Sequence, residues 1–125
     1  MSDRIKVLLG DESRAVRLLL SALLRDDSRF TVIGDVGTGV ELLDRSANAD
    51  LVVVDLMLAD IDAFSLIEQL HASRPGLPIV IYAAVDPPYL RAEAAARGAV
   101  GFFAHHTDAA EVLDGFAAAA VSSGS

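Results

Sequence analysis

Two short acidic segments stand out because each follows a run of residues that is typical of a buried strand. Asp55 comes directly after "LVVV" and is followed by further apolar residues, while Asp11 and Glu12 come after "IKVLLG". Burying an unpaired carboxylate is costly, so acids in such places are expected to have a use. Carboxylates can bind a hard cation, and beside such a cation they can attack an electrophile.

The rest of the chain predicts how these acids are positioned. Short β-branched runs alternate with longer segments in which apolar residues recur at helical spacing. The predicted strands are 5–9, 30–36, 51–54, 79–82 and 101–104. A first helix follows the capping residue Ser13, and the other predicted helices are 38–48, 63–73, 87–97 and 108–121. Five strand–helix units in this order predict an α/β fold whose parallel sheet is covered by helices on both faces.

This architecture predicts where a site lies. Doubly wound sheets bind ligands beyond the carboxyl ends of the strands, where the strand order reverses. In a five-stranded flavodoxin-like (βα)5 sheet of order 2-1-3-4-5, that point lies between the first and third strands. Asp11, Glu12 and Asp55 follow these two strands, so three carboxylates are expected to converge there.

Converging carboxylates need a cation. Two unit charges about 4 Å apart repel by about 4 kcal/mol at an effective dielectric constant of about 20. Hard oxygen ligands in a partly hydrated site favour Mg²⁺. Beside this ion, the Asp55 carboxylate can attack phosphorus and form an aspartyl phosphate. The residues therefore indicate that Asp55 is a phosphoryl acceptor.

Length and composition limit the alternatives. The 125 residues suit one domain, 1–125, with 122–125 expected as a frayed tail. The absence of cysteine excludes disulfides and thiolate metal sites and suits the cytoplasm. No apolar run is long enough for a membrane span. The net charge of -8 argues against nucleic-acid binding by this domain itself.

Four segments together resemble a known family. "VLLGDES", "VVVDLML", "PIVIYAA" and "RGAVGFF" are similar, in order and spacing, to the CheY-like receiver domain of bacterial two-component response regulators. The resemblance covers essentially the whole chain. It implies that Asp55 is the phosphoacceptor, that Phe102 is the aromatic switch residue, and that the domain is regulatory rather than an enzyme. It also implies that Mg²⁺ is held by Asp11, Glu12, Asp55 and the backbone carbonyl of Met57.

The same resemblance implies the partners. The phosphodonor would be a sensor histidine kinase or a phosphotransfer protein, and a homodimer is compatible with the family. The segment "GDVGTGVELL" is most similar to the subgroup that carries a C-terminal helix-turn-helix. We therefore expect either a stand-alone receiver or a fragment of a longer regulator.

The chain departs from the family pattern near the acceptor. Ala83, followed by Ala84, stands where the family has a serine or threonine that bonds the phosphoryl group. His105 stands where the family has a lysine, and Lys6 is the only lysine in the chain. The family's methionine-proline and later glycine are replaced by Leu58, Ala59 and Ala63.

These departures leave two functions open. One is a phosphorylation switch, and the other is a phosphorylation-independent pseudo-receiver that acts as an interaction module. A phosphatase with an aspartate nucleophile is less favoured because Met57 occupies the position of its second aspartate.

Three further polar residues near the site, Asp60, Asp62 and His106, are expected to have ordinary roles. We interpret Asp60 and Asp62 as solvated turn residues, with water-mediated contact to the metal as the alternative. His105 and His106 are adjacent, so they should point to opposite sides and not share a metal, with His106 facing solvent.

Overall fold

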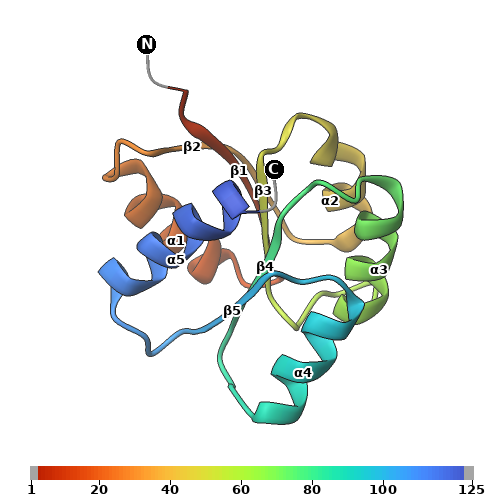
Figure 1. Ribbon diagram of the computed structural model, residues 1–125. Coiled ribbons are helices and arrows are strands. Elements are labelled where there is room, and N and C mark those ends of the chain that lie inside the picture. Colours follow the sequence, from red (N-terminus) through yellow and green to blue (C-terminus); the bar gives the residue numbers. More distant parts are fainter. Residues whose placement is uncertain (1–2, 123–125) are drawn as a thin grey trace.

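The computed structural model describes residues 3–122 and contains one sheet of five parallel strands (Figure 1). The strand order is β2-β1-β3-β4-β5, as predicted. The strands are β1 (Ile5–Gly10), β2 (Phe30–Val36), β3 (Leu51–Val54), β4 (Ile79–Ala83) and β5 (Gly101–Ala104). Two of them, β1 and β4, extend one residue further than predicted, which brings their ends closer to the acids and to Ala84.

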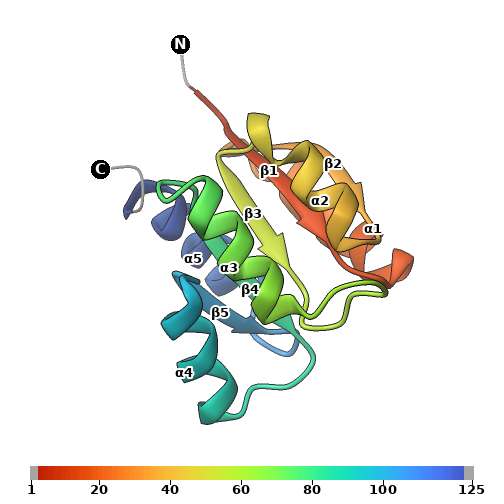
Figure 2. The same ribbon diagram turned by 90° about the vertical axis from the view of Figure 1, so that its right-hand side faces the viewer.

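The helices cover the sheet on both faces (Figures 1 and 2). Helices α1 (Arg14–Arg25) and α5 (Ala109–Ser122) lie on one face. Helices α2 (Gly39–Arg45), α3 (Ala63–Ser73) and α4 (Pro88–Arg97) lie on the other. All four residues of β3 are buried, as expected of a central strand covered on both sides.

Each face has its own hydrophobic core, because successive residues of a strand point to opposite sides. Along β3, Val52 and Val54 pack with residues of α2, α3 and α4, whereas Leu51 and Val53 pack with residues of α1 and α5. The sheet therefore separates two hydrophobic cores.

The predicted helix 38–48 is wrong in its last three residues. Its α-helical part ends at Arg45, and a 3-10 turn, η1 (Ser46–Asn48), follows. The Ser46 hydroxyl donates to the carbonyl of Leu43, and the Arg74 guanidinium donates to the carbonyls of Ser46 and Ala49. These side-chain bonds satisfy backbone groups that would otherwise continue the helix.

The end of α4 is as predicted. Gly98 caps the helix with a φ of 121°, a conformation that residues with a side chain rarely adopt. The helix begins one residue later than predicted, because Pro87 is its N-cap residue.

The chain ends are described only in part. Ser122 is the last residue of α5, and the remaining residues of the predicted tail, 123–125, lie outside the described residues, as do 1–2. Among residues 3–122, no helix is both long and apolar enough to cross a membrane.

Candidate functional site

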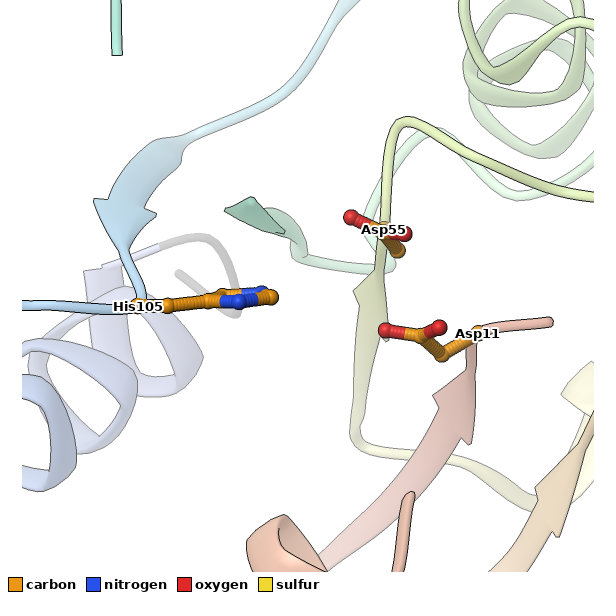
Figure 3. A group of neighbouring side chains, drawn as sticks. All are labelled: Asp11, Asp55 and His105. Carbon is orange, nitrogen blue, oxygen red and sulfur yellow. The ribbon is translucent and has the colours of Figure 1, made fainter. Parts of the chain in front are cut away.

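Asp11, Asp55 and His105 meet at the carboxyl edge of the sheet (Figure 3). They directly follow β1, β3 and β5, and their backbone amides are held by the sheet. The amide of Asp55 donates to the Gly10 carbonyl (2.9 Å), and that of His105 donates to the Ala83 carbonyl (2.8 Å). One potential ligand atom from each side chain lies within 4.8 Å of the other two. The edge of the sheet thus brings two carboxylates and an imidazole together.

Asp11 is a buried carboxyl group with a raised pKa. The residue is only 4% exposed, and this burial, opposed by a hydrogen bond from the Ser13 amide (2.8 Å), raises the pKa of Asp11 from 3.8 to about 6. The negative charge of Asp55 also raises this pKa, while His105 and Arg17 lower it. The two carboxylates therefore repel one another across the site, as their spacing in the sequence predicts.

Asp55 is in a similar position. It is 9% exposed, and burial raises the pKa of its carboxyl group. The backbone amides of Met57 and Leu56 donate hydrogen bonds to the carboxylate and oppose this rise, while the charge of Glu12 adds to it. The two backbone amides thus offset part of the cost of burying this carboxylate.

Glu12 is less central than predicted. Its side chain is exposed, and it does not belong to the group of Asp11, Asp55 and His105, although its charge still acts on Asp55. Its backbone amide donates to the Met57 carbonyl (3.4 Å), which is the predicted metal ligand. A carbonyl oxygen has two lone pairs, so this bond leaves one for a cation.

His105 extends from the end of β5 toward the two carboxylates (Figure 3). Its Nε2 lies 3.3 Å from the carbonyl of Tyr82, and its ring lies against the Tyr82 ring, tilted by 32° with centroids 4.3 Å apart. His106 is exposed, as predicted, and is not part of the cluster.

Two neighbours of the site were missed from the sequence. Arg17 on α1 donates from Nη1 to the Asp11 carbonyl (2.6 Å) and pairs through Nε with Asp35 (2.9 Å). Tyr82 supports the His105 ring. Arg17 lies four residues after Ser13, on the first turn of α1. This position could have indicated its contact with the Asp11 carbonyl. Side chains alternate along β4, so Tyr82 and Ala83 point to opposite faces of the sheet. This alternation could have indicated the contact of Tyr82 with His105.

An apolar cavity of about 350 Å³ lies beside Asp55. Ala83 forms part of its wall, where a serine or threonine would place a hydroxyl group. The rim includes Met57 and Val85, which are 63% and 56% exposed. The full lining consists of Asp55, Leu56, Met57, Asp62, Ala63, Phe64, Ala83, Ala84, Val85 and Leu90.

Phe102, the predicted switch residue, is buried at 8% exposure in the core beneath α3 and α4. The guanidinium carbon of Arg91 lies 5.1 Å from the centre of its ring, and Arg91 pairs with Asp86 (3.0 Å). Phe103 points to the opposite face, where its ring contacts that of Phe116 edge-on at 5.4 Å.

Asp60 and Asp62 are exposed and lie in the loop between β3 and α3, as predicted, but both carboxylates also have structural partners. The Asp60 carboxylate accepts hydrogen bonds from the amides of Gly39 (2.8 Å) and Val40 (3.1 Å), and these bonds lower its pKa. Asp62 caps α3 by accepting from the Ser65 amide (3.2 Å). Both carboxylates satisfy helix N-termini.

Comparison with known proteins identifies the family. The sequence model of the response regulator receiver domain matches residues 7–116, which is most of the chain. The chain therefore belongs to the receiver domain family of two-component response regulators.

Curated relatives agree with this assignment. The chain is 32% identical over 112 residues to a protein-glutamate methylesterase/protein-glutamine glutaminase of Symbiobacterium thermophilum, covering 83% of this chain and 31% of the relative. It is 29% identical over 79 residues to the response regulator protein VraR of Staphylococcus saprophyticus. This match covers 62% of this chain and 38% of VraR. It spans 53% of a Pseudomonas aeruginosa relative and 24% of a Syntrophomonas wolfei methylesterase. The chain thus spans about half or less of these relatives.

Solved structures show the same fold. A LuxR-family two-component response regulator from Aurantimonas superposes with a TM-score of 0.89 at 20% identity, over 96% of this chain and 87% of that chain. The response regulator domain of Thermotoga maritima CheB superposes with a TM-score of 0.87 at 18% identity, over 95% and 98%.

Proposed function

We propose that Asp55 accepts a phosphoryl group in a Mg²⁺-dependent reaction and that this modification switches a partner or an attached output domain. The observation that carries the proposal is the pair of buried carboxylates, Asp11 and Asp55, at the carboxyl edge of the sheet. Burial raises the pKa of both groups. Such a pair is stabilised by a cation, and its oxygen ligands suit Mg²⁺.

The residues that would hold Mg²⁺ are Asp11, Glu12, Asp55 and the Met57 carbonyl. The bound ion would neutralise the negative oxygens of the phosphoryl group. An oxygen of Asp55 then attacks phosphorus, and the bond from phosphorus to the donor breaks as the new bond forms. The amides of Leu56 and Met57 orient the attacking carboxylate.

The phosphodonor is a sensor histidine kinase or a phosphotransfer protein, and the domain is regulatory rather than catalytic toward other substrates. The VraR relative and the LuxR-family structure are named as response regulators, which supports an output in transcription control. The same proposal includes a single receiver domain spanning 1–125 and a cytoplasmic location. It also includes a helix-turn-helix output domain and a homodimer.

The direct test is the intact mass of the protein after incubation with Mg²⁺ and a small phosphodonor such as acetyl phosphate. We expect one added phosphoryl group in the wild type and none in Asp55→Asn. Asp44→Asn, an exposed acid on α2, is the matched control and should be labelled normally. A wild type that stays unmodified while a conventional receiver is labelled would refute the proposal.

The second candidate is the phosphorylation-independent pseudo-receiver, and two observations favour it. Ala83 presents a methyl group to the cavity beside Asp55, so it has no hydroxyl to bond a phosphoryl oxygen. Phe102 is already buried in the unmodified protein. The mass experiment separates the two candidates, because an interaction module needs no phosphoryl group on Asp55.

A further inference from the structure

The imidazole of His105 changes the chemistry of the carboxylate pair. Asp11, Asp55 and His105 each offer one ligand atom, and these atoms lie within 4.8 Å of one another on three separate segments (Figure 3). We infer that this group is a binding site for a divalent transition ion of the Zn²⁺ type, held by one oxygen of each aspartate and one ring nitrogen of His105.

The separations suit a shared ion. A point equally distant from three atoms that are 4.8 Å apart lies 4.8 Å divided by √3, or about 2.8 Å, from each. Zinc binds histidine nitrogen and carboxylate oxygen at about 2.0 to 2.2 Å. Each ligand atom therefore needs to move by about 0.8 Å at most, a distance within the reach of small side-chain rotations.

The surroundings of His105 prepare it as a ligand. When Nε2 carries the ring proton, it donates to the Tyr82 carbonyl 3.3 Å away, and Nδ1 keeps a free lone pair. Histidines that bind metals usually donate their other nitrogen to such a carbonyl, which fixes the tautomer and the ring orientation. The Tyr82 ring, with its centroid 4.3 Å from that of the imidazole, limits rotation of the imidazole.

The nitrogen ligand determines which ion is preferred. Imidazole suits Zn²⁺, Cu²⁺, Ni²⁺ and Co²⁺, whereas Mg²⁺ is bound by oxygen ligands and retains its water. Three protein ligands also leave a fourth tetrahedral position for water or for a group from a partner. A lysine at this position would offer no such ligand, because its ammonium group has no lone pair for a metal ion.

Occupation of this site has a consequence for regulation, which rests on the proposed function. An ion that is bound through the Asp55 oxygen blocks the atom that would attack phosphorus. A Zn²⁺-type ion would therefore compete with Mg²⁺-dependent phosphorylation, and the same residues would respond to two different inputs.

The experiment is a titration of the tag-free protein with Co²⁺, followed by its visible absorption, without any phosphodonor. The chain has no cysteine, so the spectrum reports only nitrogen and oxygen ligands. We expect one equivalent to bind, Zn²⁺ to displace it, and a hundredfold excess of Mg²⁺ not to displace it.

Adjacent histidines provide the matched variants. His105→Asn should weaken Co²⁺ binding at least tenfold, while His106→Asn, which removes an exposed imidazole one residue away, should leave it unchanged. Asp11→Asn should also weaken binding, and circular dichroism checks that each variant is folded. Equal effects of the two histidine variants, or displacement of Co²⁺ by equimolar Mg²⁺, would overturn the inference.

A second measurement separates this inference from the proposed function. Zn²⁺ should lower acetyl phosphate labelling in the wild type and much less in His105→Asn. If no variant is labelled under any condition, the phosphoacceptor proposal fails, while the Co²⁺ titration still decides whether the ion site exists.

Discussion

Replacing Asp11 with asparagine should stabilise the protein at neutral pH when no divalent cation is present. The wild-type carboxylate is 4% exposed and faces the charge of Asp55. Asparagine has nearly the same shape, and its carbonyl oxygen can still accept the hydrogen bond from the Ser13 amide. The substitution therefore removes a buried charge and keeps the local structure.

The raised pKa of Asp11 gives the magnitude and the sign of this change in the free energy of unfolding. A rise from 3.8 to about 6 corresponds to at most about 3 kcal/mol. Water at the open mouth of the site screens part of this unfavourable energy, so we expect the substitution to stabilise the protein by about 1 to 2 kcal/mol. Because the folded protein holds the proton more tightly, the contribution of Asp11 to stability is fully present below about pH 4 and is lost as the pH rises through about 6.

Urea denaturation with EDTA between pH 4 and pH 8, followed by far-UV circular dichroism, measures this effect. The free energy of unfolding of Asp11→Asn should match that of the wild type near pH 4 and exceed it by about 1 to 2 kcal/mol at pH 7.5, or by about 4 to 8 °C in Tm for a domain of this size. Millimolar Mg²⁺ should stabilise the wild type and narrow the difference. If the variant is equally or less stable at pH 7.5, or if the difference does not change with pH, the account of the buried pair is refuted.

Three further substitutions test other parts of the site and fold. Arg17→Ala should lower the free energy of unfolding by about 1 to 2 kcal/mol, because it removes a charged donor from the Asp11 carbonyl; an unchanged urea midpoint would contradict this. Ala83→Thr should tighten beryllofluoride binding about tenfold or more, because the new hydroxyl would form a charge-assisted hydrogen bond with the ligand. Calorimetry with Mg²⁺ measures this affinity. Equal affinity in the two proteins would show that the hydroxyl does not reach the ligand. Gly98→Ala should destabilise by about 1 to 2 kcal/mol because φ is 121°; a Tm equal to that of the wild type would show that α4 can end otherwise.

The sequence predicts the fold well because its strongest signals are local. Short β-branched runs and the helical spacing of apolar residues predict all five strand–helix units. Parallel sheets of this kind place the carboxyl ends of their strands at one edge. The positions of Asp11 and Asp55 follow from that rule alone. The predicted convergence of these two acids is therefore a consequence of topology rather than of any detail of packing.

What the sequence could not predict depends on side-chain direction or on contacts between distant segments. Glu12 follows Asp11 directly, and spacing alone does not show which of two adjacent acids turns inward. Asp60 binds amides about twenty residues earlier in the chain, a contact that no local pattern reveals. Whether His105 reaches the acids depends on a rotamer that is set by Tyr82.

The strand order has a consequence for how the site responds to local unfolding. Asp11 and Asp55 follow the adjacent central strands β1 and β3, but His105 follows the edge strand β5, which pairs only with β4 among residues 3–122. A local opening that detaches β5 and α5 would carry the imidazole away and leave the carboxylate pair in place. An ion held by all three side chains would tie this edge strand to the centre of the sheet across β4. Amide hydrogen exchange in β5 would then slow when the ion binds, because opening would first require its release.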